Sequence, residues 1–433
     1  LLKNYLPAGE TLPAVPAALP VIEIPEFHFH KVAPLFSNLP EAKQTVDIQP
    51  MEQFNQGWGT ILYRTTLPET TLAGTTLKIT EVHDWAQIYA DGKLLARLDR
   101  RKGEFTTTLP ALKKGIQLDI LVEAMGRVNF DKSIHDRKGI TEKVELISGN
   151  QTKELKNWTV YNFPVDYSFI KDKKYSDTKI LPTMPAYYKS TFTLDKVGDT
   201  FLDMSTWGKG MVWVNGHAMG RFWEIGPQQT LFMPGCWLKE GENEILVLDL
   251  KGPTRASIKG LKKPILDVLR EKAPETHRKD GEKLKLTGEK VGHEGAFTPG
   301  NGWQEVRFAT PVKGRYFCLE ALSPQANDNI AAIAEFDVLG ADGKPVSREH
   351  WKIRYADSEE TRSGNRTADK IFDLQESTFW MTVDNVLYPH QLVIDLSKVE
   401  NVTGFRYLPR AEKGYPGMIK EYRVYVKPAD FNY

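Results

Sequence analysis

The sequence predicts an all-β protein built from three β-sandwich domains in a row. Glycine and proline contribute 33 and 26 of the 433 residues, and aromatic residues make up 11% of the chain. Strands and the turns between them favour this mixture. From about residue 57, short β-rich runs such as residues 60–67, 77–82 and 85–89 alternate with turn residues. Short strands at this spacing are typical of sandwiches and barrels.

An internal repeat defines the first two domains, because its offset stays at 124 or 125 positions along the chain. The paired runs are residues 63–67 with 188–192, 85–92 with 209–216, and 120–122 with 245–247. Asp91-Gly92 and Asn215-Gly216 each lie between two strand-like runs, where a two-residue turn with positive φ needs these residue types. We therefore predict two related β-domains, residues 51–155 and residues 156–256.

The segments outside the repeat have a different character. Residues 1–50 contain eight prolines, which keep the backbone extended and predict a strap between domains. Pro264 is followed by apolar residues at helical spacing, which predicts a short helix over residues 264–272 within a connector of residues 257–285. Residues 286–433 return to alternating apolar and polar positions, which predicts a third β-domain.

The balance of charge excludes two classes of partner. Lysine and arginine total 57 against 56 acidic residues, for a net charge of +1, so no strong field attracts nucleic acid or an anionic membrane. No apolar run is long enough for a spanning helix, so we expect no nucleic-acid partner and no membrane insertion. Cys236 and Cys318 are too far apart for a zinc motif, and we expect both to be buried thiols in strands.

No motif of a known catalytic site is present. The sequence lacks the nucleophile elbow, the zinc-protease motif, the phosphate-binding loop and the EF-hand loop. His28 and His30 stand two apart, as metal ligands on a strand could, but no carboxylate pattern accompanies them and we expect ordinary histidines. A carboxylate pair for glycoside hydrolysis could lie among the 56 acidic residues. Only the distance between two carboxyl groups in the folded protein would identify such a pair.

Tryptophan and glycine motifs occur in both repeated domains. The later ones are Trp207-Gly208-Lys209-Gly210, Trp213-Val214-Asn215-Gly216, Gly220-Arg221-Phe222-Trp223 and Gly226-Pro227-Gln228-Gln229. The earlier ones are Gly57-Trp58-Gly59-Thr60 and Gly126-Arg127-Val128-Asn129. Through these motifs, residues 1–256 resemble the β-domains of family 35 glycoside hydrolases, the β-galactosidases. The resemblance implies two galactose-binding-like jelly rolls in tandem.

The resemblance also implies where catalysis is located. Members of the family carry their catalytic glutamates on a (β/α)₈ barrel that precedes the β-domains, and no segment here alternates strand and helix in that way. We therefore assign no catalytic residue to this chain. We therefore expect residues 1–50 to be the strap that leaves an N-terminal barrel missing from this sequence, which starts without methionine. That barrel is the expected partner, in the same polypeptide. We expect Trp207, Trp213 and Trp223 to fill sandwich cores or an interdomain face rather than stack on sugars.

A second resemblance covers residues 286–433. The matching pieces are residues 351–355, 368–380, 389–396, 404–410 and 419–422. They resemble the discoidin, or coagulation factor 5/8 type C, fold, and within it the family 32 carbohydrate-binding modules. The same fold also hosts lipid and protein binders, so the fold alone does not name a ligand.

The second resemblance implies a structural Ca²⁺ ion. Asp373, Thr378 and Glu421 occupy the places of the side-chain ligands, with backbone carbonyls expected from Lys370, Gln375 and Lys420. Hard oxygen ligands of this kind suit Ca²⁺. In the alternative interpretation, Asp373 is a turn residue and Glu421 is a surface charge.

We expect carbohydrate to bind on loops at one end of the third domain, because the side chains within the strands pack in the core. A galactose-like ring needs an aromatic face and planar polar groups. The loop residues that meet these needs are Tyr388, His390, Tyr415 and Arg366, whereas Trp380 is expected in the core.

Three functions follow from these expectations. In the first, the chain is the non-catalytic C-terminal part of a β-galactosidase that hydrolyses terminal β-D-galactosides, supporting the barrel and binding galactose-containing glycans. If bacterial, that protein would be exported to the periplasm or the extracellular space. The second function is a free-standing sugar-binding or adhesion protein. The third is an enzyme whose site lies among the β-domains themselves.

Overall fold

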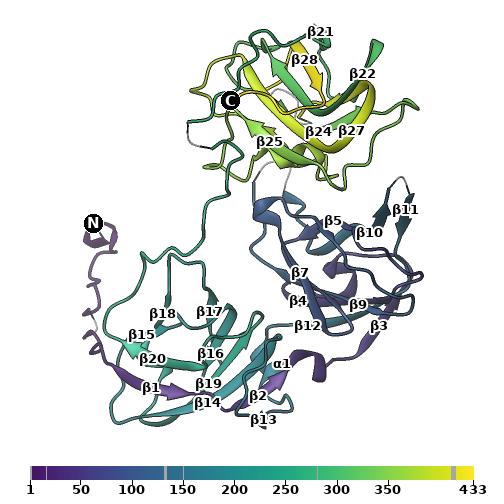
Figure 1. Cartoon of the computed structure of the whole chain (residues 1–433). Coiled ribbons are helices and arrows are strands. Elements are labelled where there is room, and N and C mark those ends of the chain that lie inside the picture. Colours follow the sequence, from purple (N-terminus) through teal and green to yellow (C-terminus); the bar gives the residue numbers. More distant parts are fainter. Residues whose placement is uncertain (1, 16, 131–133, 150, 280, 411–415) are drawn as a thin grey trace. The chain divides into compact units, whose positions relative to one another are not determined.

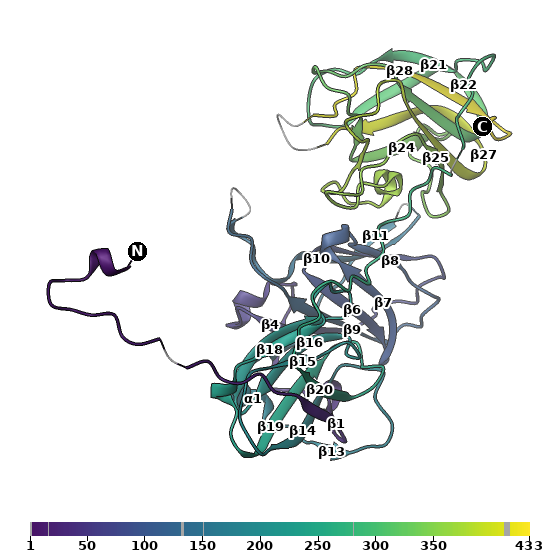
Figure 2. The ribbon, with the colours of Figure 1, turned by 90° about the vertical axis from the view of Figure 1, so that its left-hand side faces the viewer.

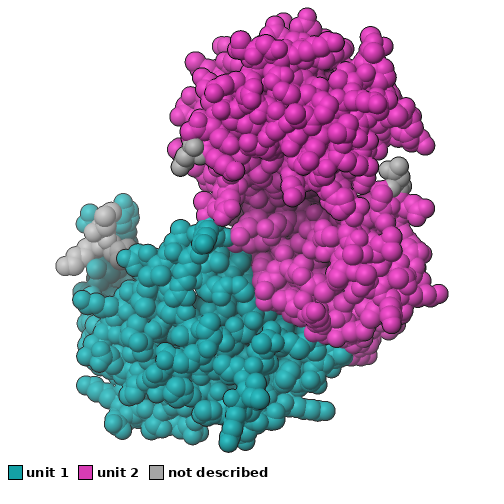
Figure 3. All heavy atoms as spheres, in the orientation of Figure 1, with its two compact units in different colours: residues 1–40, 164–272 teal, residues 41–163, 273–433 magenta. Residues whose placement is uncertain are grey.

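The computed structural model describes residues 2–15, 17–130, 134–149, 151–279, 281–410 and 416–433 (Figure 1). The all-β prediction is confirmed, and helix in these residues is limited to short turns. The turns are η1 (Leu2–Tyr5), η2 (Leu35–Ser37), η3 (Met51–Phe54), η4 (Arg100–Lys102), α1 (Tyr167–Ile170), η6 (Gly235–Trp237) and η7 (Ala368–Phe372). The chain forms two compact units (Figure 3): unit 1 is residues 1–40 and 164–272, and unit 2 is residues 41–163 and 273–433.

Unit 1 is a sandwich of two antiparallel sheets (Figure 2). The larger sheet contains, from edge to edge, β13 (Ser176–Asp177), β2 (Lys31–Pro34), β14 (Ala186–Leu194), β19 (Gly241–Asp249), β16 (Lys209–Val214) and β17 (His217–Trp223). The smaller sheet contains β1 (Ile24–His28), β20 (Ser257–Leu261), β15 (Thr200–Asp203) and β18 (Thr230–Met233). Apolar side chains from both sheets form one core around Trp207.

Residues 41–163 of unit 2 form a second sandwich of the same kind. Its larger sheet contains β3 (Ala42–Thr45), β12 (Trp158–Phe163), β4 (Gly59–Thr66), β9 (Gln117–Ala124), β6 (Trp85–Ala90) and β7 (Lys93–Asp99). Its smaller sheet contains β11 (Gln151–Glu154), β10 (Gly139–Ser148), β5 (Thr76–His83) and β8 (Thr106–Thr108). The core between the sheets includes Tyr63 and Trp158.

The internal repeat is confirmed by the order of the strands. The run β4-β9-β6-β7 in one large sheet has the same order as β14-β19-β16-β17 in the other. The two predicted hairpin tips join β6 to β7 and β16 to β17. Asp91 and Gly92 have φ values of 44° and 77°, and Asn215 and Gly216 have φ values of 48° and 86°. These left-handed conformations explain why aspartate, asparagine and glycine occupy the turns.

Residues 273–433 of unit 2 form the third β-structure. Its main sheet contains β21 (His293–Ala296), β28 (Glu421–Lys427), β22 (Gln304–Ala321), β27 (His390–Leu408) and β24 (Glu335–Leu339), with β25 (Lys352–Ala356) paired to β27. A two-stranded sheet contains β23 (Ala332–Ile333) and β26 (Trp380–Met381). Phe317, Phe336 and Phe405 pack with Trp380 in the core.

The predicted segment boundaries differ from the structure at two places. The proposed strap of residues 1–50 contributes β1 and β2 to unit 1, through pairing with β20 and β14, and β3 to unit 2. The second domain was expected to start at residue 156, but β12 pairs with β4 and belongs to the first sandwich. Extended segments rich in proline can still form strands at or near the edge of a sheet, which the proline count alone does not reveal.

The predicted helix over residues 264–272 does not form, and the connector is extended there. Its backbone instead pairs with the loop of residues 225–229: Gln229 N donates to Ile265 O at 2.9 Å, and Val268 N donates to Pro227 O at 3.0 Å. A helix of about two turns has little stability of its own. The backbone hydrogen bonds to residues 225–229 therefore determine the conformation of this segment, and its helical apolar spacing does not.

Several single residues test the sequence-based expectations. Trp207 and Trp213 are buried, as predicted, whereas Trp223 is only half-buried and lies 4.2 Å from Lys209 Nζ. Cys318 is buried in β22, but Cys236 is exposed in η6, so that prediction is wrong for Cys236. Within the described residues, no helix has the length and apolar character needed to cross a membrane.

Candidate functional site

Two of the four residues predicted to hold sugar take part in the domain's own hydrogen bonding. His390 starts β27 and is fully buried, with Nδ1 2.8 Å from Asp357 Oδ2 and Nε2 2.7 Å from Asn329 O. Tyr388 is half-buried and donates its hydroxyl to Ile330 O at 2.7 Å. Burial raises the pKa of Tyr388. Sugar binding by His390 stays a prediction, and in the structure both of its ring nitrogens hold neighbouring loops together.

The other two predicted sugar residues have different outcomes. Arg366 is half-buried in the loop between β25 and η7, where its guanidinium carbon lies 4.1 Å from the ring centre of Phe379. Tyr415 lies outside the described residues, and its role stays a prediction. The structure brings Tyr388 and His390 into ring contact at 4.6 Å.

Three of the predicted Ca²⁺ ligands lie together in the loop that follows η7. Asp373 Oδ1 accepts from Gln375 N at 3.0 Å, and the Thr378 hydroxyl donates to the Asp373 carboxylate at 2.8 Å. Thr378 Oγ1 also lies 2.9 Å from Gln375 O. Lys370 Nζ is 3.8 Å from Asp373 Oδ2. The loop thus brings together oxygen atoms of Asp373, Gln375 and Thr378, among them the half-buried carboxylate of Asp373.

Glu335 supplies a second carboxylate beside this loop, and the sequence analysis missed it. It starts β24 with 2% of its surface exposed, and it pairs with Arg348. Burial raises the pKa of Glu335 to about 8 against the opposing charge of Arg348, and the nearby Asp373 carboxylate adds to the rise. Burial likewise raises the pKa of Asp373 to about 7. Oε1 of Glu335 receives no hydrogen bond from the part of the chain that the structure describes.

Glu421 and Lys420, the remaining predicted ligands, are used differently. Glu421 is exposed at the start of β28 and accepts a hydrogen bond from Ser323 Oγ at 2.9 Å. The carbonyl of Lys420 accepts from Phe297 N at 2.8 Å, so it serves backbone pairing. The carboxylate whose charge adds to the raised pKa of Asp373 is Asp369, whereas the charge of Asp373 adds to the raised pKa of Glu335.

A sequence signal for Glu335 did exist. Residues 331–339 are apolar except for Glu335 and Asp337, which stand two apart and therefore lie on the same face of a strand. Both are buried and both pair with Arg348. Acidic residues at alternate positions in a buried strand indicate a charged partner or a cation.

The burial of this site does not suit glycoside cleavage. Glycosidases need two carboxyl groups that flank a sugar linkage, but Glu335 is 2% exposed, too little for a linkage to reach it. The described residues contain no group of three or more His, Cys, Asp or Glu side chains arranged for a metal. A cation here would therefore depend on Thr378 and carbonyl oxygens as well as on Asp373 and Glu335.

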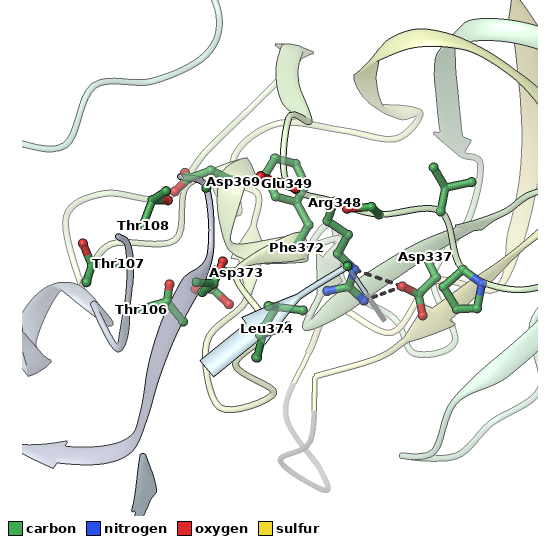
Figure 4. A pocket seen from close by; sticks show the side chains of 17 residues that line it. Thr106, Thr107, Thr108, Asp337, Arg348, Glu349, Asp369, Phe372, Asp373 and Leu374 are labelled. Atoms are coloured by element: carbon green, nitrogen blue, oxygen red, sulfur yellow. Dashed lines mark hydrogen bonds and ion pairs between the residues drawn. The ribbon is translucent and has the colours of Figure 1, made fainter. Parts of the chain in front are cut away.

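A polar cavity of about 390 Å³ adjoins this site within unit 2 (Figure 4). Threonine hydroxyls and charged side chains dominate its wall, including Thr106, Thr107, Thr108, Asp369, Asp373 and Arg348. Figure 4 shows Arg348 directed at Asp337, and Nη2 of Arg348 lies 2.7 Å from Asp337 Oδ1. Hydroxyl, carboxylate and guanidinium groups on one wall suit a polar ligand.

Three family models match successive parts of the chain. Residues 49–164 match the β-galactosidase first all-beta domain, and residues 185–243 match the β-galactosidase galactose-binding domain. Residues 355–433 match the F5/8 type C domain. The order of the matches follows the order of the three β-structures along the chain.

Curated relatives agree with the family models. The chain is 34% identical to beta-galactosidase-1-like protein 2 of Homo sapiens, over 46% of this chain and 30% of that protein. It is 33% identical to a beta-galactosidase of Xanthomonas manihotis, over 52% and 36%, and 35% identical to the beta-galactosidase of Bos taurus, over 52% and 37%. The match thus spans about a third of the length of each relative. The chain thus matches, in succession, the first all-beta domain and the galactose-binding domain of β-galactosidases and an F5/8 type C domain.

Proposed function

We propose that the whole protein is an exported, retaining β-galactosidase that hydrolyses terminal β-D-galactosides, and that this chain supports its catalytic barrel and binds galactose-containing glycans. The observation that carries the proposal is the succession of two β-galactosidase domains in one chain, over residues 49–164 and 185–243. A coding sequence upstream of Leu1 with a (β/α)₈ segment of about 250 residues is expected. A start codon directly before Leu1 would contradict it.

The chain of 433 residues is expected to show no turnover of a chromogenic β-galactoside. Loops and aromatic faces can hold a sugar, but cleavage requires two positioned carboxylates about 5–5.5 Å apart in a retaining enzyme. The measurement is release of the chromophore against a buffer blank. Turnover that disappears when one acidic residue within residues 57–256 is replaced by its amide would show that the active site lies among the β-domains.

We also propose that the F5/8 type C domain holds a Ca²⁺ ion through Asp373 and Glu335, with Thr378 and the Gln375 carbonyl as further oxygen ligands. The support is the orphaned, buried Oε1 of Glu335 and the two carboxylates whose pKa values are raised by burial. A divalent cation would neutralise both carboxylates and give that oxygen a partner. When bound, it would fix the loop after η7.

Calcium is expected to raise the melting temperature of the chain by several degrees relative to a chelated sample. A ligand that binds only the native state stabilises it by about 2.7 kcal/mol at a hundred times its Kd. Asp373→Asn should abolish the calcium effect, whereas Glu421→Gln should leave it intact. Differential scanning calorimetry with calcium and with chelator measures both. If wild type melts at the same temperature in the two conditions, no site is present; if only Glu421→Gln loses the effect, Glu421 is the ligand instead of Glu335.

A further inference from the structure

The connector between the two units is attached by hydrogen bonds on either side of a short exposed segment. In unit 1, Arg270 N donates to Ile225 O at 2.8 Å, and Arg270 Nη1 donates to Ser205 O at 2.8 Å. In the part of the chain that the structure describes, no hydrogen bond holds residues 272–276, which are exposed except for the half-buried Pro274. The next attached residue is His277, which belongs to unit 2. His277 therefore marks the end of the unattached segment.

His277 is attached to a buried carboxylate through both its backbone and its ring. The backbone N–H of His277 donates to Glu359 Oε2, and Nδ1 of the ring lies 2.8 Å from Glu359 Oε1. Glu359 lies in the loop between β25 and η7, and its side chain is 1% exposed. Its Oε1 also accepts from Ala368 N at 2.7 Å. We call the pair of His277 and Glu359 the connector clamp.

The connector clamp depends on the charge of its histidine. Among the described residues, no cation other than His277 pairs with Glu359. A buried carboxylate is costly unless a cation and hydrogen bonds compensate its charge. The imidazolium form of His277 supplies a full opposing charge, whereas the neutral ring supplies at most one uncharged N–H group. Hydrogen bonds between ionised groups are about twice as strong as neutral ones.

The charged groups around the ring favour the imidazolium form. Besides Glu359, the ring faces Asp369 of η7, whose Oδ1 lies 4.0 Å from His277 Nε2. The neighbouring cations have other partners: Arg278 donates to Asp357 O at 3.1 Å, and Lys370 Nζ lies 3.9 Å from Asp369 Oδ2. Burial alone would lower the pKa of His277, but the hydrogen bond and the charge of Glu359, followed by the charge of Asp369, raise it above its ordinary value.

The direction of this shift fixes the pH range in which the connector clamp holds. A histidine whose pKa is raised in the folded protein binds its proton more tightly there than in the unfolded chain. Its contribution is therefore fully present below about pH 6.5, the ordinary pKa of histidine. The contribution is lost as the pH rises through the raised value. Mildly acidic solution thus closes the clamp and alkaline solution opens it.

We propose that the connector clamp is a pH-sensitive switch that sets the length of the unattached linker between unit 1 and the F5/8 type C domain. With His277 protonated, the unattached segment ends at residue 276. Without the proton, the charge-assisted bond is lost, and Leu284 is the next buried side chain among the described residues of the connector. The linker then lengthens toward residue 283, and each released residue adds up to about 3.3–3.6 Å of reach.

The test is hydrogen exchange of the whole 433-residue chain from about pH 5.5 to about pH 8.5, on either side of the raised pKa. Exchange is resolved at the amide of His277, which is itself a donor in the clamp, and labelling times are scaled so that intrinsic exchange stays constant. We expect protection of this amide to fall about tenfold across the range, because a hydrogen bond between charged groups is lost.

Two variants remove the switch in different ways. His277→Gln keeps a side-chain donor for Glu359 but carries no ionisable proton, so its protection should be low and independent of pH. Glu359→Gln keeps an oxygen for Ala368 N but removes the charge, and its profile should also be flat. The matched control is His350→Gln, because His350 lies in the same domain with its side chain 77% exposed, 3.9 Å from Glu349. This control should keep the wild-type profile.

The outcomes decide the proposal independently of sugar or calcium binding. A flat profile in the wild-type chain overturns it, and so does a pH-dependent fall of wild-type size in His277→Gln. A fall that disappears in His350→Gln as well would assign the effect to the general charge of the domain. If Glu359→Gln loses its melting transition, His277→Gln decides alone, because it leaves the hydrogen bond between Glu359 and Ala368 in place.

Discussion

Replacing Lys138 with methionine is expected to lower the free energy of unfolding of the sandwich of residues 41–163 by about 3–5 kcal/mol. The side chain of Lys138 has no exposed surface, and its Nζ lies 2.7 Å from Asp84 Oδ2 and 2.7 Å from Asp136 Oδ2. Both aspartate side chains are also buried. Methionine fills a similar volume but carries no charge, so the two buried carboxylates would lose the ammonium group that both of them contact.

A second cation beside these carboxylates is Arg100, whose Nη1 lies 2.8 Å from Asp84 Oδ1 and 2.7 Å from Asp136 Oδ1. Within the described residues, the two acids thus contact both Lys138 and Arg100, and His83 Nδ1 also lies 3.3 Å from Asp136 Oδ1. Burial alone would raise the pKa of Asp136, but hydrogen bonds from Lys138, Val128 N and Arg100 outweigh it and lower this pKa to about 2. Lys138 is thus part of what keeps Asp136 ionised inside the domain.

The loss can be measured in the whole chain by native-state hydrogen exchange of the amides in β9 and β10, which report the opening of this sandwich. The matched control is Lys156→Met. Lys156 pairs with Asp47 and Glu154 at 2.6 Å, but its side chain is 41% exposed, and an exposed pair contributes about 0–1 kcal/mol. Equal, small losses in the two variants would show that the buried network does not stabilise the domain.

The sequence predicted the features that depend on local residue types. The hairpin tips at residues 91–92 and 215–216 were predictable because a left-handed turn restricts which residues can occupy it. The repeat was predictable because equivalent strands keep their spacing. The helix predicted over residues 264–272 was wrong because its conformation depends on distant residues. The apolar spacing is helical, but the backbone of this segment bonds to residues 225–229.

The candidate site was predicted only where its residues are close in the chain. Asp373, Gln375 and Thr378 belong to one loop and were found together. Glu335 comes from a different strand, and its approach to Asp373 depends on how the sandwich closes. His390 follows Pro389 in a loop-like sequence, and nothing local indicates that Asp357 and Asn329 would enclose it.

Replacing Trp207 with alanine is expected to lower the free energy of unfolding of unit 1 by about 3–5 kcal/mol, the usual cost of removing a large buried aromatic side chain. Trp207 is 1% exposed. Its ring meets those of Phe29 and Tyr188 edge-on at 5.0 Å and 5.1 Å, and its Nε1 donates to Ser257 O at 2.9 Å. The indole thus links the core to the start of β20. Alanine would leave a cavity, and the Ser257 carbonyl would keep only the longer hydrogen bond that Thr206 Oγ1 donates at 3.5 Å among those of the described side chains.

Hydrogen exchange of the amides in β14 and β19 measures this loss in the whole chain, with Trp58→Ala as the matched control. Trp58 is 46% exposed, so its removal should change the stability of its own sandwich by no more than about 0.5 kcal/mol. Trp207→Phe keeps a ring in the core but removes the indole N–H, and its loss should fall between the two. Trp207 could instead stack on a sugar ring. Measuring galactoside binding by the Trp207→Ala chain distinguishes that role from a role in the core. A Trp207→Ala chain that keeps its stability but no longer binds galactosides would place this residue in a binding site rather than in the core.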